Sequence, residues 1–392
     1  FAETSMGLIH PLMGIVGLAG LTIAAGYALL AVIAVLVWQM RRMPKESRPR
    51  LPPLTILKPL CGAEASLYEN LRSFCEQDYP EFQIVFGVLD PADAALSVVE
   101  RLVAEFPSLP IDVVINSQLH GGNRKTSNLI NLLAQARHDV LVMADSDARV
   151  GPDYLKTVSA PLLDREVGLV TCIFRGIASP RLWSRLGAMY INDWYTPLVL
   201  LARLFGHQGY VSGQTICLRR ETLQAMGGLQ VIADHLADDY QLGERVRGLG
   251  LRIVLSHYMP TAEHDEASFD SLNRHELRWM STIRVLRPRS FRLIFFSFSL
   301  PLSALGIVLN AADPLFSTVA WALFEFTVVA RLTLHGVYRL RDDRSLFSDL
   351  WLVPVRDLLI CWVWWHSFFT SRVTWRGREF DVDARGIMHR TP

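Results

Sequence analysis

A long uncharged stretch near the N-terminus limits how this chain can fold. Residues 5–40 contain no Asp, Glu, Lys or Arg. As a helix, the segment from about residue 12 to residue 38 is long enough to cross a hydrocarbon core of roughly 30 Å. A cleaved signal peptide begins with basic residues, whereas here the positive charge follows the apolar run. The pattern therefore predicts an uncleaved membrane anchor.

Two further apolar blocks predict a helical hairpin through the membrane. Residues 293–312 carry no charge, and residues 315–330 are interrupted only by Glu325. A carboxylate in lipid is costly, so Glu325 is expected to face protein, headgroups or a cavity.

The last apolar block, residues 350–370, is broken by Pro354, Arg356 and Asp357. The uninterrupted run that remains is too short to span a bilayer comfortably. Its Trp residues suit a membrane interface. We expect an interfacial or re-entrant segment and three spans in all, with a fourth span as the alternative.

Basic residues follow the apolar blocks and orient them. They lie at positions 41, 42, 45, 48 and 50 after the first block and at 331, 339, 341 and 344 after the hairpin. The positive-inside rule then places the N-terminus outside and the intervening chain in the cytoplasm. The predicted organisation is a transmembrane anchor with a basic linker (1–50), a globular domain (51–290), a transmembrane hairpin (291–334), and an interfacial segment with a cytoplasmic tail (335–392).

Charge and cysteine content exclude some classes of protein. The formal net charge is only +1, whereas a nucleic-acid binder would carry a strong basic excess. The five cysteines are scattered without metal-ligand spacing, as in a protein of a reducing compartment.

Within the globular domain, apolar strands alternate with helical patterns. Strands are predicted near residues 54–58, 83–89, 112–115 and 140–144, and helices near residues 67–77, 92–105 and 125–136. This order predicts an α/β fold with a mostly parallel, Rossmann-like sheet covered on both faces. No GxGxxG or P-loop motif follows a strand, which disfavours dinucleotide redox enzymes and P-loop NTPases.

Acidic residues follow the predicted strands, at the sheet edge where such folds bind ligands. Asp90 follows the second strand, and Asp145 and Asp147 follow the fourth. Two carboxylates separated by one residue can hold Mg²⁺ or Mn²⁺ with room for a diphosphate. For this pair alone, a solvated turn with a helix N-cap is the alternative.

Two predicted helix starts also carry charge. Lys125 opens a helix, where a cation is unfavourable unless an anion lies at that end, so phosphate is suspected nearby; a solvated lysine is the alternative. Asp238 and Asp239 begin another helix, where acids are expected for dipole reasons alone.

Histidine and aromatic residues supply the remaining candidates. His275, Arg278 and Trp279 fall within about one helical turn and could grip a diphosphate or a sugar ring, although packing is the alternative. Either His257 or His264 could complete a metal shell, with a structural role as the alternative for each.

Several motifs occur in an order that resembles a known family. They are LKPLCG (57–62), SFCEQDYP (73–80), FGVLDPAD (86–93), NRKTSNL (123–129), ADSDARVGPDYL (144–155), GLVTC (168–172), LADDYQLG (236–243) and HELRWMSTIR (275–284). Over about residues 54–288 the chain resembles family 2 type glycosyltransferases with a GT-A fold, specifically the ceramide-glucosyltransferase-like branch. Within this branch, residues 137–147, 234–243 and 275–284 look most like the bacterial hopanoid-biosynthesis-associated glycosyltransferases.

The resemblance implies a membrane-bound inverting enzyme of the bacterial inner membrane, multi-pass, with its catalytic domain in the cytoplasm. It implies transfer of a sugar, N-acetylglucosamine as the best guess, from a UDP-sugar to a hopanoid polyol such as bacteriohopanetetrol. A ceramide glucosyltransferase that uses UDP-glucose is the main alternative. A processive polysaccharide synthase and an inactive membrane scaffold are weaker alternatives.

The resemblance also implies roles for the charged residues of the globular domain. Asp90 would bind the nucleotide at the uracil end and Lys125 nearer the phosphates. Asp145 and Asp147 would form the DxD motif that binds Mg²⁺ or Mn²⁺. Asp239 would be the general base, with Asp238 beside it in the nucleotide-sugar site.

The HELRW segment matches a family motif of QxxRW type. Arg278 and Trp279 would contact the diphosphate and the acceptor site. His275 departs from the family's usual Gln or Arg, so its role is less defined than that of Arg278.

Overall fold

The computed structural model describes residues 2–40, 51–64, 66–339, 348–370, 372–375, 378–383 and 385–390. The basic residues predicted to orient the chain at positions 41–50, 341 and 344 lie outside these ranges. Two compact units make up the chain. Unit 1 comprises Phe1–Arg41, Pro180–Gly206 and Glu266–Val373, and unit 2 comprises Arg42–Ser179, His207–Asp265 and Thr374–Pro392.

Unit 2 is built on a seven-stranded sheet of order β3-β2-β1-β4-β8-β6-β9. Its strands are β1 (Leu54–Pro59), β2 (Phe82–Val88), β3 (Ile111–Ile115), β4 (Val140–Met143), β6 (Val167–Cys172), β8 (Ile216–Arg219) and β9 (Arg252–Ser256). Only β8 runs antiparallel to its neighbours β4 and β6, and the other pairings are parallel. The mostly parallel sheet predicted from the sequence is thus confirmed.

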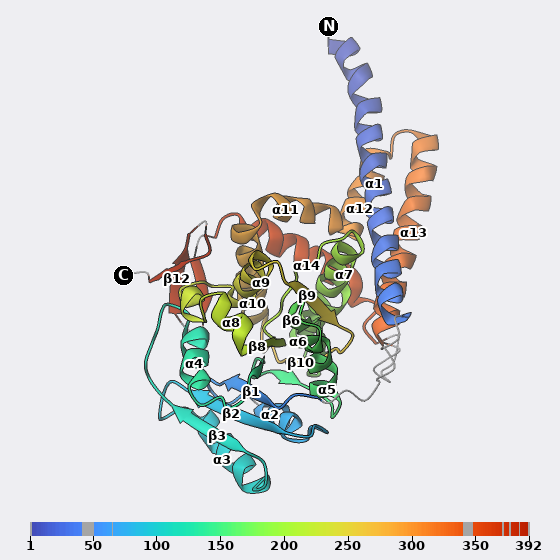
Figure 1. Cartoon of the computed structure of the whole chain (residues 1–392). Helices are drawn as coiled ribbons and strands as arrows, with labels where there is room; N and C mark the ends of the chain where they lie inside the picture. Colours follow the sequence, from blue (N-terminus) through green and yellow to red (C-terminus); the bar gives the residue numbers. More distant parts are fainter. Residues whose placement is uncertain are drawn as a thin grey trace. The chain divides into compact units, whose positions relative to one another are not determined.

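Helices cover both faces of this sheet (Figure 1). They are α2 (Leu67–Cys75), α3 (Ala95–Glu105), α4 (Arg124–Leu133), α5 (Tyr154–Ser159), η1 (Ala160–Leu163), α8 (Arg220–Ala225), η3 (Gln230–Ile232) and α9 (Asp238–Gly248). The first three match the helices predicted from the sequence within a few residues.

The core of unit 2 divides at the sheet because neighbouring strand residues point to opposite faces. In β1, Leu54 and Ile56 pack into a cluster with α2, α3 and α5, whereas Leu57 packs into a second cluster with α4, α8 and α9. Both faces of β1 are therefore buried, as expected for a strand whose six residues are all buried.

Short strands form two further small sheets. β5 (Ala148–Arg149), β10 (Thr261–His264) and β7 (Arg175–Ala178) form a three-stranded sheet with β10 in the middle. Near the C-terminus, β11 (Arg372–Trp375) precedes a hairpin of β12 (Arg378–Val382) and β13 (Met388–Arg390).

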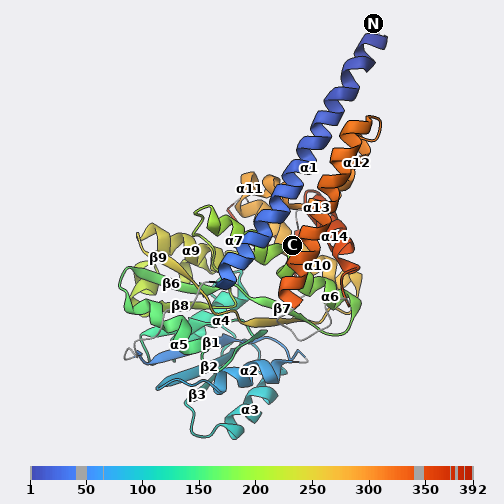
Figure 2. The same ribbon diagram turned by 90° about the vertical axis from the view of Figure 1, so that its right-hand side faces the viewer.

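Unit 1 is helical. Its elements are α1 (Ala2–Met40), α6 (Leu182–Met189), the π-helix η2 (Tyr190–Tyr195), α7 (Thr196–Leu204), α10 (Phe269–Leu286), α11 (Pro288–Leu293), η4 (Ile294–Ser297), α12 (Ser299–Leu309), α13 (Pro314–Arg339) and α14 (Leu352–Ser367). Figure 2 shows α1 running beside α12 and α13, and the three helices contact one another.

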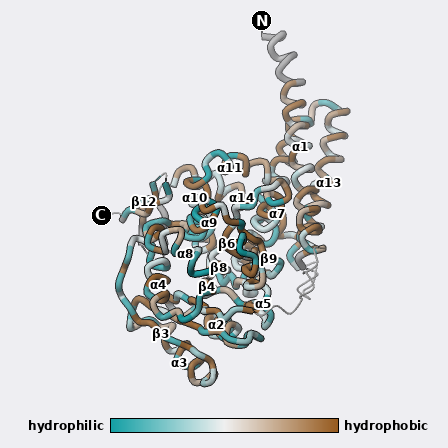
Figure 3. Tube along the Cα trace, in the orientation of Figure 1, coloured by the Kyte–Doolittle hydropathy of each residue, from teal (hydrophilic) through white to brown (hydrophobic). Residues whose placement is uncertain are grey.

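Some helices of unit 1 are long and apolar enough to cross a membrane. Two qualify alone, Leu12–Met40 and Pro314–Val337, and the pair Pro288–Ser297 and Ser299–Leu309, bent by 64°, qualifies if it counts as one span. The hydrophobic colouring along α1 and α13 is visible in Figure 3. These segments correspond to the anchor and the hairpin expected from the sequence, and Glu325 is exposed on α13.

The charges that interrupt the last apolar block form buried ion pairs inside unit 1. Arg356 donates to both carboxylate oxygens of Glu276, at 2.6 and 2.7 Å. Arg331 donates to Asp357 through Nε at 3.0 Å and Nη2 at 2.5 Å. Arg331 therefore does not lie in a solvated basic cluster after the hairpin, because its side chain is only 4% exposed and already neutralised.

Candidate active site

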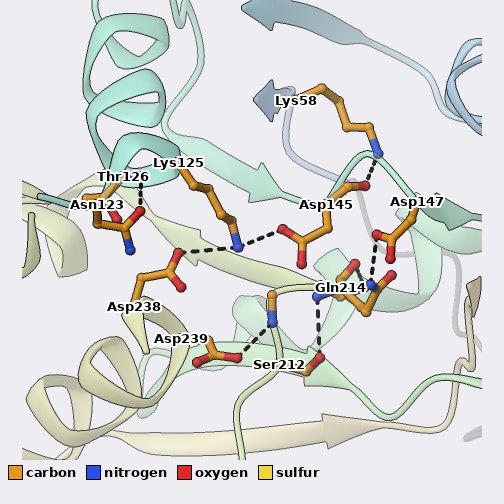
Figure 4. A network of polar contacts seen from close by, with 12 residues as sticks. Lys58, Asn123, Lys125, Thr126, Asp145, Asp147, Ser212, Gln214, Asp238 and Asp239 are labelled. Carbon is orange, nitrogen blue, oxygen red and sulfur yellow. Dashed lines mark hydrogen bonds and ion pairs between the residues drawn. The ribbon is translucent and has the colours of Figure 1, made fainter. Parts of the chain in front are cut away.

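Four segments of unit 2 bring charged side chains together (Figure 4). They are the turn after β4, the first turns of α4 and α9, and the loop that precedes β8. The residues collected there include five of those predicted from the sequence: Lys125, Asp145, Asp147, Asp238 and Asp239.

Lys125 is the cation at the centre of this cluster. Its Nζ lies 2.6 Å from Asp145 Oδ1 and 3.2 Å from Asp238 Oδ2. Asn123 caps the same helix end, where its side chain accepts from the Thr126 amide at 3.0 Å. Burial alone would lower the pKa of Lys125, but Asp145 and Asp238 raise it above its ordinary value. The anion expected at this helix start is thus supplied, in this structure, by two carboxylates.

Asp239 lies at the start of α9, where its carboxylate accepts two backbone hydrogen bonds. Oδ2 accepts from the Gly213 amide at 3.2 Å, and Oδ1 from the Tyr240 amide at 2.7 Å. Burial, followed by the charge of Asp238, raises the pKa of Asp239 to about 6. A carboxyl group of this pKa is largely ionised at neutral pH and is more basic than an ordinary aspartate.

The backbone of Gly213 joins Asp239 to the DxD turn. Its carbonyl accepts from the Asp145 amide at 3.1 Å, while its own amide donates to Asp239. A Cβ at this position would lie 2.7 Å from Asp145 Oδ2 and 2.7 Å from Lys125 Nζ. The ion pair thus occupies the space that a side chain at this position would fill.

Asp147 points to a different neighbour from Asp145. Its Oδ1 accepts from Gln214 Nε2 at 2.9 Å. Burial and the nearby charge of Asp145 raise the pKa of Asp147. Extra positive charge beside Asp147 would therefore stabilise its ionised form.

Lys58 is a site residue that was not predicted from the sequence. It is fully buried at the end of β1, and its Nζ donates to the Asp145 carbonyl at 2.5 Å and lies 3.8 Å from the centroid of the Phe74 ring. Burial lowers the pKa of Lys58 to about 7, against the opposing charges of Asp147 and Asp145. A lysine inside an apolar strand was the signal that could have identified it.

Two other predicted residues lie elsewhere in unit 2. Asp90 is exposed in the loop after β2, where Oδ1 accepts from the Ala92 amide at 2.9 Å. His264 is buried at the end of β10, two residues beyond the pairing of Ala262 with Ala148 of β5.

His275, Arg278 and Trp279 lie on α10 in unit 1. The imidazole Nδ1 of His275 lies 2.8 Å from Glu266 Oε1, and its ring centroid is 4.2 Å from that of Trp279. Trp279 also packs against Tyr190 of η2, with 5.2 Å between the ring centroids. The helix presents an imidazole, a guanidinium and an indole together, as predicted.

The oxygen-rich DxD turn suits a hard divalent cation. Asp145 and Asp147 offer carboxylates of the kind that Mg²⁺ and Mn²⁺ prefer. Across the part of the chain that the structure describes, no three His, Cys, Asp or Glu side chains are grouped closely enough to hold a metal. His264 is therefore not brought together with both aspartates, and a third protein ligand would have to be of another type.

Comparisons with known proteins agree with this architecture. Ceramide glucosyltransferase 1 of Caenorhabditis elegans is 21% identical over 360 residues, which cover 87% of this chain and 74% of that protein. Beta-monoglucosyldiacylglycerol synthase of Trichormus variabilis is 26% identical over 240 residues, which cover 59% of this chain and 48% of that protein.

A mannosyltransferase from Pyrobaculum calidifontis, solved in complex with GDP-Man and Mn²⁺, shares the fold. The TM-score is 0.55 at 19% identity, with coverage of 91% of this chain and 99% of that chain. The likeness confirms the predicted GT-A fold. The family model described as Glycosyl transferase family 21 matches residues 20–388. This chain, with its mostly parallel sheet and its carboxylates gathered beyond β4, is a glycosyltransferase that belongs to glycosyl transferase family 21.

Proposed function

We propose that this chain is a membrane-bound inverting glycosyltransferase that moves a sugar from a UDP-sugar to a hydroxyl group of a lipid. The position of Asp239 is the main support for this proposal. Its carboxylate, with a pKa raised to about 6, is held by the Gly213 backbone that also contacts Asp145. The backbone of Gly213 thus contacts both the proposed general base and the proposed diphosphate-binding turn.

In the proposed reaction, Asp239 accepts the proton of the acceptor hydroxyl. The hydroxyl oxygen forms a bond to the anomeric carbon as the bond from that carbon to the diphosphate oxygen breaks, and the electron pair leaves with UDP. Because the attack is a single displacement from the opposite side, a UDP-α-sugar gives a β-glycoside.

Positive charge is needed where UDP leaves. Lys125 is placed to bind phosphate once it exchanges Asp145 or Asp238 for the incoming anion. A divalent cation, Mg²⁺ or Mn²⁺, held by Asp145 and Asp147, would add charge stabilisation of the leaving diphosphate. The Mn²⁺ in the mannosyltransferase complex supports a divalent metal in this fold.

The other predicted residues complete the proposed donor and acceptor sites. We assign Asp90 to the uracil end of the nucleotide and Asp238 to the orientation of Lys125. Arg278 and Trp279 are assigned to the diphosphate and the acceptor, with His275 beside them. Their assignment rests on the resemblance of the HELRW segment to a family motif.

The apolar helices support a membrane location. We propose that α1, the bent pair α11 to α12, and α13 cross the bacterial inner membrane, with α14 at the interface and the transferase domain in the cytoplasm. The helices that qualify by length and composition support this arrangement. We keep the domain boundaries expected from the sequence, at residues 50, 290 and 334, as part of this proposal.

A lipid acceptor is supported by the relatives. Their names refer to two different lipids, ceramide and diacylglycerol, which points to a lipid hydroxyl as the shared feature. We propose a hopanoid polyol such as bacteriohopanetetrol, with N-acetylglucosamine as the sugar, on the resemblance of three motifs to the hopanoid-associated branch. Ceramide with UDP-glucose is the second candidate, because two relatives that align over at least 85% of the chain are ceramide glucosyltransferases.

The test is a matrix of donors and acceptors. Purified protein in detergent is incubated with UDP-N-acetylglucosamine or UDP-glucose, Mg²⁺ or Mn²⁺, and either a hopanoid polyol, ceramide or diacylglycerol, and the lipids are analysed by mass spectrometry. An N-acetylhexosamine on the hopanoid is expected. A hexose on ceramide would overturn the substrate but keep the transferase mechanism, and failure of every pair would favour a polysaccharide synthase or an inactive scaffold.

A further inference from the structure

An amide oxygen next to the DxD turn accepts no hydrogen bond within the described part of the chain. Gln214 is 6% exposed, and its Nε2 donates to Asp147 Oδ1 at 2.9 Å (Figure 4). Its Oε1 is buried and has no hydrogen-bond partner among the residues that the structure describes. A buried acceptor without a partner is costly, and at a functional site it points to a missing ligand.

The backbone of Gln214 is fixed, so only the side chain can adapt. Its amide donates to Ser212 Oγ at 3.3 Å, and its carbonyl accepts from Thr215 Oγ1 at 2.7 Å. Rotation of the side-chain amide by half a turn exchanges Oε1 with Nε2 and leaves the backbone contacts in place. The side-chain amide of Gln214 can therefore adopt two orientations at this position.

The rotated amide matches the ligand spacing of a divalent cation. Oε1 would then take the place of Nε2, 2.9 Å from Asp147 Oδ1. Neighbouring oxygens on an octahedral Mg²⁺, with bonds of about 2.0–2.1 Å, lie roughly 3 Å apart. Two oxygens at this distance repel each other unless a cation lies between them.

Asp147 has no close positive partner in the ranges that the structure describes, so its carboxylate can bind a divalent cation. Asp145 is paired with Lys125, whereas Asp147 forms no ion pair with Lys or Arg among the described residues and interacts with the charge of Lys58 only at longer range. In the described part of the chain, no three His, Cys, Asp or Glu side chains lie close enough together to bind a metal ion by themselves. An amide oxygen is a ligand that Mg²⁺ and Mn²⁺ accept readily.

We propose that Gln214, through Oε1, is a protein ligand beside Asp147 for the divalent cation of this enzyme. The inference rests on the metal-dependent transferase proposed above. Without the cation, Gln214 Nε2 holds the Asp147 carboxylate, and with the cation the amide turns to offer its oxygen. Gln214 thus fills the position in the metal shell for which His264 was considered.

The test measures Mn²⁺ binding directly. Full-length protein in detergent is titrated with Mn²⁺, with and without UDP, and free Mn²⁺ is followed by electron paramagnetic resonance. Gln214→Met, which keeps the volume but offers no oxygen, should weaken Mn²⁺ binding by at least about tenfold. Gln214→Glu should keep Mn²⁺ affinity within about threefold or increase it, because a carboxylate supplies the oxygen.

The Glu variant separates a ligand from a hydrogen-bond donor. If Gln214 only donates to Asp147, an ionised Glu that cannot donate would bind Mn²⁺ as weakly as Met does, and the inference would be overturned. Unchanged Mn²⁺ affinity in Gln214→Met would overturn it too. Asp147→Asn serves as the reference variant, which is expected to lose Mn²⁺ even where Gln214 is intact. Absence of Mn²⁺ binding in the unaltered protein would instead overturn the proposed metal dependence itself.

Discussion

Lys125 Nζ and Asp145 Oδ1 lie 2.6 Å apart, and the same ammonium reaches Asp238 Oδ2 at 3.2 Å. One lysine therefore links the DxD turn to the helix that carries Asp239. Because the ion pair neutralises Asp145 without a ligand, an incoming diphosphate competes with that carboxylate for the lysine. Donor binding and the arrangement of the acidic residues are coupled through this one side chain.

Replacement of Lys125 by Met is expected to weaken UDP binding by about tenfold or more, because charge-assisted hydrogen bonds to phosphate are lost and two carboxylates are left facing the anion. Isothermal titration calorimetry measures the effect. The neighbouring Arg124 provides a matched control, since it forms no ion pair with any residue that the structure describes. Equal UDP affinity in Lys125→Met and Arg124→Met would contradict the assigned role.

The transfer rate should depend on pH through Asp239. Burial and Asp238 raise the pKa of this carboxyl to about 6, and only its ionised form accepts a proton. The rate should therefore be constant at high pH and fall as the pH drops through about 6, to about one tenth of the plateau one unit below the pKa. Initial rates between pH 4.5 and 8.5 test this. A rate that stays constant down to pH 5 would rule out a base of this pKa.

Gly213→Ala should reduce transfer by about tenfold or more without unfolding the protein. The new methyl group would meet Asp145 Oδ2 and Lys125 Nζ at 2.7 Å, so the ion pair must move. Gly248→Ala is the control, because a Cβ there meets nothing within 4 Å and Ala favours the helix. Initial rates of the two variants should differ clearly, and equal rates would show that the Gly213 contact is unimportant.

The buried pair of Arg356 and Glu276 should matter for stability. Their side chains are 0% and 1% exposed, so removing one partner leaves the other as a buried charge without a counter-charge. Glu276→Gln or Arg356→Met alone is expected to cost about 3–5 kcal/mol, and the double variant Glu276→Leu/Arg356→Met less than the sum. Thermal denaturation in detergent measures the change. Asp270→Asn on the same helix is the control, since its ion pair with Arg274 is exposed and should contribute under about 1 kcal/mol. Additive losses in the double variant would contradict a direct coupling.

Inversion of configuration follows from a single displacement by a lipid hydroxyl. We expect a β-linked product from a UDP-α-sugar, which proton NMR of the purified glycolipid distinguishes by the coupling of the anomeric proton. An α-linked product would require a different mechanism and would remove the need for a general base at Asp239.

The sheet and its acidic edge were predictable because they depend on local patterns. Strands such as β1 and β4 are short apolar runs, and parallel order places their carboxyl ends, with Asp145 and Asp147, at one edge. The antiparallel β8 was not predicted, because the four residues ICLR carry no signal of direction. The loop before β8 supplies Gly213 and Gln214, so missing this strand also meant missing the contacts of Asp239 and Asp147.

Contacts between distant segments explain the remaining differences. The sequence indicated an anion near Lys125 but not that Asp145 and Asp238 supply it, since these residues are far apart in the chain. In the sequence, Arg356 and Asp357 interrupt an apolar block. In the fold, both are buried, and each forms an ion pair, Arg356 with a residue of α10 and Asp357 with a residue of α13. Sequence patterns reveal charge in an apolar segment, but only the fold shows which opposite charge meets it.

The Asp239→Asn variant tests the proposed mechanism at its base, with glycolipid formation and UDP affinity measured on the same preparation. If Asp239 is the general base, transfer should fall by at least about a hundredfold, whereas UDP affinity should stay within about threefold of that of the unaltered protein. Transfer at a rate close to that of the unaltered protein would contradict Asp239 as the general base and, with it, the proposed mechanism.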